Sequence, residues 1–179
     1  MAAGKLFFAG IFLCCELLQP GAAQTGFISI DCGSTVSYTD GLGIDWVGDE
    51  GYASNGANAV IDTKKANLGP DALTDRNKLQ TLRYFPEPAG KFCYDIPVGT
   101  AGQYLIRMSF LAGNWSSDPA NFSVSLGAAH WQDLTIDDPW TPTIKEANFV
   151  ALQVNLPSCF QRGASGVPVR EVDRDPPAQ

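Results

Sequence analysis

QYLIRMSFLA, residues 103–112, carries large apolar side chains at every second position: Tyr104, Ile106, Met108 and Phe110. A period of two is typical of a β-strand, in which successive side chains point to opposite faces of the sheet. Arg107 belongs to the other set, and its charge indicates that this second face is partly exposed. The stretch therefore predicts a half-buried strand of an antiparallel sheet, with the first set in the core.

Further alternating segments occur on both sides of this stretch. Residues 122–126 (FSVSL) and 149–154 (FVALQV) predict two more strands, and residues 27–31, 79–85 and 92–96 predict shorter ones. Turn clusters rich in glycine, aspartate and proline separate them. Several short strands without a long helical pattern predict an all-β fold, an antiparallel β-sandwich of jelly-roll type.

The composition fits one globular domain with a net negative charge. The chain has 179 residues, of which 45% are hydrophobic and 17% charged, and its formal charge is −7. These values are typical of a packed domain. A negative surface repels phosphate backbones and anionic lipid, so we expect no nucleic-acid partner, whereas basic peptides fit.

Residues 1–23 have the pattern of a secretory signal peptide. Lys5 precedes an apolar run at residues 6–15 (LFFAGIFLCC), and small residues at 21–23 predict cleavage before Gln24. A buried N-terminal helix is the alternative. The run is too short to cross a bilayer core of about 30 Å, and no later stretch is long enough, so we expect no membrane span.

The secreted chain would consist of one domain and a tail. We expect the domain to occupy residues 24–169. Residues 170–179 (REVDRDPPAQ) are charged and end in prolines, a composition that predicts a disordered tail.

If the chain is secreted, its cysteines can form disulfides and its two sequons can be glycosylated. Cys32, Cys93 and Cys159 remain after cleavage, and an odd number permits at most one disulfide within the chain. The pairing stays open, and three buried thiols are the alternative. Asn114 and Asn121 begin Asn-Trp-Ser and Asn-Phe-Ser, which predict two glycosylation sites near one turn.

The sequence lacks the patterns of catalysis. His130 is the single histidine, and no serine lies in a nucleophile-elbow motif, so no standard triad can be assembled. No cluster of histidines and cysteines has metal-ligand spacing. We therefore expect no catalytic residue, no metal, no cofactor and no enzyme activity, and we interpret His130 as a surface or packing residue.

The best candidate ligand site lies in residues 35–73, which are poor in strand signal and rich in glycine, asparagine and aspartate. A long irregular stretch in a compact domain is usually functional or loosely ordered. A sugar site needs an aromatic face and a few placed polar groups. Core packing is the alternative for each tryptophan. The candidate residues are Tyr38, Asp40, Asp45, Trp46, Asp49 and Tyr52.

Five blocks of the chain, in order, resemble those of plant malectin-like domains, the extracellular part of many leucine-rich-repeat and related receptor-like kinases. Together they extend from about residue 27 to residue 168, and an ordered set is far more specific than any one block. The blocks are FISIDCG (27–33), SYTD (37–40) with WVGD (46–49), LRYFP (82–86) with Cys93, YLIR (104–107) with FLAGN (110–114), and Cys159 with Gly166 and Pro168.

The resemblance implies a β-sandwich related to animal malectin, a galactose-binding-like lectin fold that binds glucosylated glycans. The blocks correspond to a single first lobe, whereas the receptors usually carry two lobes, a single membrane helix and a kinase at the plasma membrane. It implies a secreted, apoplastic or cell-surface recognition module for cell-wall carbohydrate or a signalling peptide. The alternative is a truncated receptor fragment that has no ligand of its own and associates with full-length receptor ectodomains.

Overall fold

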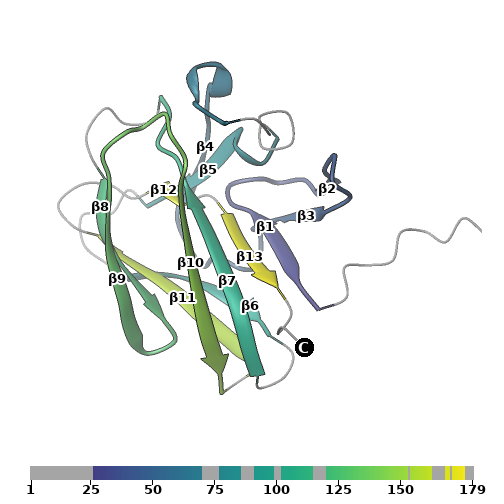
Figure 1. Cartoon of the computed structure of the whole chain (residues 1–179), viewed down its shortest axis with the longest axis vertical. Coiled ribbons are helices and arrows are strands. Elements are labelled where there is room, and N and C mark those ends of the chain that lie inside the picture. Colours follow the sequence, from purple (N-terminus) through teal and green to yellow (C-terminus); the bar gives the residue numbers. More distant parts are fainter. Residues whose placement is uncertain are drawn as a thin grey trace, which may run out of the picture.

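The computed structural model describes residues 26–69, 77–85, 91–98, 102–114, 120–152, 154–162, 168–169 and 171–175 (Figure 1). The expected signal peptide, residues 1–23, lies outside this range. The elements are β1 (Ile28–Asp31), β2 (Tyr38–Thr39), β3 (Asp45–Gly48), β4 (Ala57–Val60), the 3₁₀ helix η1 (Thr63–Lys65), β5 (Thr81–Tyr84), β6 (Lys91–Pro97), β7 (Gly102–Phe110), β8 (Ala120–Leu126), β9 (Ala129–Ile136), β10 (Thr143–Ala151), β11 (Asn155–Arg162), β12 (Pro168–Val169) and β13 (Glu171–Asp175).

Two large sheets face one another, and a small third sheet lies at one end (Figure 1). Sheet A has the strand order β10-β7-β13-β1-β3-β2, and sheet B has the order β6-β11-β8-β9. Sheet C has the order β12-β5-β4. Neighbouring strands are antiparallel except β1 and β3, which are parallel. The predicted antiparallel β-sandwich is confirmed.

The predicted alternation of β7 is also confirmed. Tyr104, Ile106, Met108 and Phe110 are all buried, with at most 6% of their surface exposed. Phe110 meets sheet B through Phe122, with ring centroids 5.1 Å apart. Tilted and edge-to-face aromatic pairs add to the apolar burial. The core therefore lies between sheets A and B, where the sequence pattern placed it.

The strand predicted at residues 149–154 is confirmed only in its first half. Residues 149–151 are the end of β10 and β11 begins at Asn155, so Leu152 and Val154 lie where the chain crosses from sheet A to sheet B. Val150, Leu152 and Val154 are 54%, 84% and 62% exposed. Alternation of apolar residues shows which side chains could be buried together, but not whether another part of the fold covers them. Here these three side chains face solvent.

The predicted disordered tail also differs from the structure. Residues 171–175 form strand β13, which pairs with β7 on one side and with β1 on the other. Ladder hydrogen bonds join backbone groups, so a charged sequence does not prevent pairing between two strands that each need a partner. The segment that composition marked as a tail thus completes the middle of sheet A.

Residues 35–69 contain more regular structure than their composition indicates. Strands β2, β3 and β4 and the η1 turn all lie within this segment. Each has at most four residues. Such short strands carry too few alternating positions to be recognised from sequence. Among the described residues, no helix is long and apolar enough to cross a membrane.

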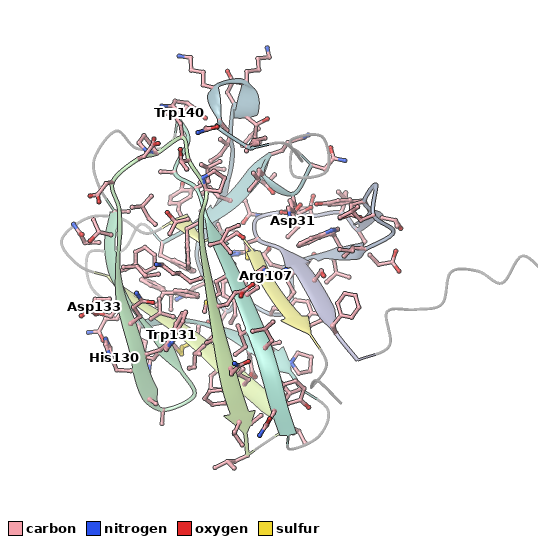
Figure 2. The ribbon with its side chains drawn as sticks, in the orientation of Figure 1. Asp31, Arg107, His130, Trp131, Asp133 and Trp140 are labelled. Atoms are coloured by element: carbon pink, nitrogen blue, oxygen red, sulfur yellow. A yellow bond between two sulfur atoms is a disulfide. The ribbon has the colours of Figure 1, made fainter. Side chains whose placement is uncertain are left out.

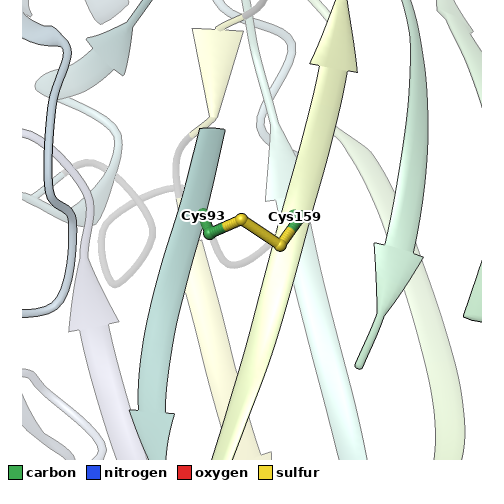
Figure 3. Close-up of a disulfide and its surroundings, with 2 residues drawn as sticks. All are labelled: Cys93 and Cys159. Atoms are coloured by element: carbon green, nitrogen blue, oxygen red, sulfur yellow. A yellow bond between two sulfur atoms is a disulfide. The ribbon is translucent and has the colours of Figure 1, made fainter. Parts of the chain in front are cut away.

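A disulfide joins β6 to β11 (Figure 3). Cys93 and Cys159 lie directly opposite each other in the antiparallel register. The bridge closes a loop with a sequence separation of 66 residues. Cys32 is a buried thiol outside this bridge. The prediction of at most one disulfide holds for these cysteines, and the structure supplies the pairing that the sequence left open.

Candidate functional site

Strands β2 and β3 form a short ribbon that contains most of the expected ligand residues. Tyr38 lies opposite Trp46 in the register, and their rings stack with centroids 6.4 Å apart. Lys78 places its Nζ atom 5.2 Å from the centroid of the Trp46 ring. Trp46 itself is only 1% exposed. The indole is therefore packed on its neighbours and presents no open face for a sugar ring.

The loop that follows β2 is held by the carboxylate of Asp40. The backbone amides of Leu42 and Ile44 donate to its Oδ1 at 2.8 and 3.0 Å, and the Trp46 indole donates to its Oδ2 at 3.1 Å. Burial raises the pKa of Asp40, but the hydrogen bonds from Ile44 and Trp46 outweigh it, so the pKa lies below its ordinary value. Asp40 thus acts as a loop-capping residue.

Asp49 is the centre of a buried polar cluster. Arg83 donates to it through Nε at 2.6 Å and Nη2 at 2.7 Å, the Tyr94 hydroxyl donates at 2.8 Å, and the Gly33 amide donates at 2.8 Å. Asp49 is 0% exposed. Paired and fully hydrogen-bonded in this way, the carboxylate ties the turn after β1 to β5 and β6.

Two members of this cluster, Arg83 and Tyr94, have shifted pKa values. The hydrogen bonds that Arg83 donates to Asp49 raise the pKa of Arg83 above its ordinary value, although burial acts against them. Burial raises the pKa of Tyr94 well above its ordinary value, and the nearby Cys32 and Asp49 raise it further. Arg83 therefore remains charged and Tyr94 remains neutral, which is the state that the cluster needs.

The structure thus divides the six expected residues. Tyr38, Asp40, Asp45 and Trp46 share the β2–β3 ribbon, and Thr39 donates to Asp45 at 2.6 Å across it. Asp49 is turned toward β5 and β6 instead. Tyr52 packs against the core and accepts a backbone hydrogen bond from Asp95 at 2.9 Å. Asp40, Trp46 and Asp49 thus make contacts that hold the fold, and a ligand-binding role of the six residues stays a prediction.

A different surface, the outer face of sheet B, has the chemistry of a polar binding site. In the register, Gln161 of β11 lies opposite Ser123 of β8, and Ser123 lies opposite Asp133 of β9. Asn121 and Thr135 form the next pair along β8 and β9. These five side chains surround a shallow concavity of about 340 Å³. Their common face follows from the period of two, because the intervening Phe122, Val124 and Leu134 point into the core.

Asp133 is the charged centre of this face. The Ser123 hydroxyl donates to its Oδ1 at 2.6 Å, and His130 Nε2 lies 3.0 Å from the same oxygen (Figure 2). The hydrogen bond from Ser123 and, to a smaller extent, the contact with His130 lower the pKa of Asp133. The carboxylate is therefore ionised at neutral pH. Both contacts involve Oδ1, which leaves Oδ2 accessible to a ligand hydroxyl.

These three residues do not form a hydrolytic triad. In a triad the histidine lies between the serine and the carboxylate and accepts the serine proton. Here the carboxylate of Asp133 lies between Ser123 and His130, and the serine donates to the carboxylate. The arrangement is suited to holding polar groups in place and does not activate a nucleophile.

Both sequon asparagines are exposed. Asn114 accepts a hydrogen bond from the Asp62 amide at 2.8 Å, and Asn121 accepts one from the Thr135 hydroxyl at 2.7 Å. These contacts use the side-chain oxygen, so the nitrogen that would carry a glycan remains accessible. Glycosylation stays a prediction, and a glycan on Asn121 would stand at the margin of the sheet B concavity.

Comparison with known proteins decides the family. Residues 30–170 match the family model of the malectin-like domain. The chain belongs to the malectin-like domain family. A probable LRR receptor-like serine/threonine-protein kinase of Arabidopsis thaliana is 31% identical over 170 residues, which is 91% of this chain and 19% of the kinase. A second such kinase is 31% identical over 92% of this chain and 20% of its own length. This chain thus spans about a fifth of the length of these relatives.

Solved structures support the fold independently. The extracellular domain of ANXUR2 from Arabidopsis thaliana superposes with a TM-score of 0.66 at 16% identity, covering 84% of this chain and 41% of that one. A β-glucuronidase of Bacteroides uniformis gives a TM-score of 0.64 at 15% identity, over 87% of this chain and 18% of the enzyme. At these identities the likeness shows the fold alone. The family assignment therefore rests on the match of residues 30–170 and on the homology to receptor-like kinases.

Proposed function

We propose that this malectin-like domain is a non-enzymatic recognition module that binds neutral carbohydrate on the outer face of sheet B. The observation that carries the proposal is the row Gln161–Ser123–Asp133 across three adjacent strands, with Asn121 and Thr135 beside it. Hydroxyl, amide and carboxylate groups complement the hydroxyl groups of a saccharide. A shallow polar concavity can orient several of them at once.

Charge favours a neutral saccharide over an acidic one. The chain carries a net charge of −7, and Asp133 adds an ionised carboxylate at the centre of the concavity. Acidic polysaccharides would meet repulsion from both, whereas a neutral saccharide meets none. Asp133 can accept a hydrogen bond from a sugar hydroxyl, and hydrogen bonds to charged groups are the stronger kind.

A glycan array of neutral plant cell-wall oligosaccharides tests the proposal. We expect Asp133→Asn to weaken binding at least tenfold and Gln161→Ala about fivefold, since a hydrogen bond to a charged group contributes about 1.5–3 kcal/mol and a neutral one about 1 kcal/mol. The matched controls are Asp45→Asn and Gln103→Ala, which change exposed residues of sheet A and should leave affinity unchanged.

Two outcomes would contradict this function. Folded protein that retains no neutral oligosaccharide removes the carbohydrate function altogether. Loss of binding in Tyr38→Ala, with Asp133→Asn unaffected, would move the site to the β2–β3 ribbon. Because Asn121 borders the concavity, the array should use protein with and without N-linked glycan.

A signalling peptide is the second candidate ligand, and the charge of −7 favours it because a negative surface attracts basic peptides. Peptide binding of this kind would weaken steeply as salt is raised, whereas binding of a neutral saccharide would not. A comparison of affinities in low and high salt therefore separates the two candidates.

Secretion and glycosylation are part of the same proposal. We infer that residues 1–23 direct export and are removed before Gln24, and that Asn114 and Asn121 carry glycans. Exposure of both asparagines supports the second inference. Intact mass of protein from a secretory host, before and after enzymatic deglycosylation, measures both. A mass that retains residues 1–23, or that does not change on deglycosylation, would contradict the corresponding inference.

A further inference from the structure

We propose that strand β10 binds a second copy of this chain, by antiparallel pairing of β10 with β10 of the partner about a two-fold axis at Ala147. The proposal starts from the position of β10 at the end of sheet A. One side of β10 pairs with β7 over all nine residues, Thr143–Ala151. On the other side, no strand pairs with it in the part of the chain that the structure describes.

An open strand edge presents a row of backbone donors and acceptors that another chain can use. Natural edges are usually protected by proline, by bulges or by being very short. Strand β10 contains no proline, and its register with β7 runs without a bulge from Thr143 to Ala151. Of the common protections it has only charge, at Lys145 and Glu146, and Glu146 is already paired with Arg107 at 2.7 Å.

The side chains of β10 are self-complementary about its centre. Ile144 and Val150 lie on the outer face and are 56% and 54% exposed. Each is three residues from Ala147, the middle residue of the strand. A two-fold axis at Ala147 therefore places Ile144 of each copy opposite Val150 of the other. Apolar pairs directly opposite each other on adjacent strands are a main source of sheet stability.

The charges of β10 favour a two-fold axis at Ala147 over an axis at Lys145 or Glu146. With the axis at Ala147, Glu146 lies opposite Asn148, and no like charges meet. Moving the axis to Lys145 would place the two Lys145 residues directly opposite each other, which is destabilising. Moving it to Glu146 would do the same with the two Glu146 residues, and an axis between two residues would pair outward-facing with inward-facing side chains. Only the axis at Ala147 also uses the whole strand.

An apolar groove at the end of β10 extends the surface. It has a volume of about 400 Å³ and lies beside the β8–β9 turn, where Phe149, Val150, Leu152, Ala128 and Pro157 line it. Exposed apolar surface of this kind marks interaction sites. A partner strand along β10 would cover the groove mouth next to Val150. The pairing and the groove form one continuous surface.

The size of the contact sets the expected affinity. Stable complexes bury about 800 Å² on each partner. Pairing of one nine-residue strand lies below that size, so we expect a reversible dimer with a dissociation constant in the micromolar range. The net charge of −7 on each copy weakens association further at low ionic strength, because the copies repel each other.

Analytical ultracentrifugation of the secreted chain, from about 5 to 500 μM, tests the proposal at physiological salt. The expected result is a monomer–dimer equilibrium that Val150→Lys shifts at least tenfold toward monomer. Val60→Lys is the matched control, because Val60 is 78% exposed on β4 of sheet C and should not change the equilibrium. Circular dichroism checks that both variants keep the strand content of the parent.

A mixing experiment tests the register. A chain with Ile144→Glu and a chain with Val150→Lys should each be monomeric alone. Mixed together, they should form a heterodimer, because the new glutamate of one faces the new lysine of the other. A chain that stays monomeric at every concentration, a dimer that survives Val150→Lys, or a mixture that does not associate would overturn the proposal.

Discussion

Replacing Asp49 by asparagine tests the buried polar cluster in isolation from the surface. Asparagine keeps the shape but removes the charge, and its amide nitrogen is a donor where Arg83 also donates. One carboxylate oxygen takes only the Nη2 bond of Arg83, at 2.7 Å, and the other takes the bonds from Nε, Tyr94 and Gly33. The best placement of the new amide nitrogen therefore still opposes one guanidinium donor.

The loss of stability in Asp49→Asn depends on how much of the Arg83 charge remains buried without a partner. Removing one partner of a buried ion pair costs about 3–5 kcal/mol. The Arg83 side chain is 12% exposed, so water partly compensates, and we expect a loss of about 3 kcal/mol in the free energy of unfolding. Asp45→Asn is the matched control, since Asp45 is an exposed aspartate of the neighbouring strand β3. It should cost less than about 0.5 kcal/mol.

Urea denaturation at pH 7, followed by tryptophan fluorescence, measures both losses. Adding Arg83→Met to Asp49→Asn removes the stranded charge, so the double variant should be more stable than the sum of the two single losses by about 1–3 kcal/mol. A loss below about 1 kcal/mol for Asp49→Asn, or additive single losses, would refute the reasoning that this ion pair holds the turn after β1 to β5 and β6.

Three further predictions concern stability. Replacing Cys93 and Cys159 together by serine should cost about 4 kcal/mol of unfolding free energy, because the bridge closes a loop with a separation of 66 residues; a loss below about 1 kcal/mol in urea denaturation would contradict this. Gly33→Ala should cost about 3 kcal/mol, because Gly33 has φ +86° and an added Cβ would lie 2.3 Å from the Leu82 oxygen; a melting temperature equal to that of the parent would contradict it. Tyr94 has a raised pKa in the folded state, so its contribution is complete below its ordinary value of 10.0 and is lost as pH rises above that value. Stability should therefore fall more steeply in alkali for the parent than for Tyr94→Phe, and equal slopes would refute the assignment.

The fold was predictable for strands that bury only one of their two faces. In β7, Tyr104 and Phe110 point into the core and Arg107 points out, so the sequence carries the geometry directly. The same rule failed in part at residues 149–154, because alternation shows only that one side could be buried. Whether another layer covers that side depends on the rest of the fold.

The polar and covalent contacts were less accessible to sequence reasoning. Trp46 and Asp49 stand among turn residues, which suggested an open site, but the structure closes Lys78 over the indole and Arg83 over the carboxylate. Both partners lie about 30 residues further along the chain, and no local pattern links them. The disulfide was equally undetermined, since three cysteines allow three pairings.

The sequence contains a pattern that indicates the polar outer face of sheet B. Asn121 and Ser123 alternate with buried residues in β8, and Asp133 and Thr135 do so in β9. Each strand alone is typical of a solvated face. The site exists only because the register places Ser123 opposite Asp133, and register between strands is set by tertiary contacts.

Binding of a neutral saccharide to the outer face of sheet B is tested most directly by nuclear magnetic resonance. Isotopically labelled, deglycosylated protein is titrated with cellohexaose and then with other neutral cell-wall oligosaccharides, and backbone amide shifts are followed. The proposal predicts that the largest changes occur at residues 121–123, 132–135 and 160–161. Changes confined to residues 38–52, or no changes with any oligosaccharide, would contradict it.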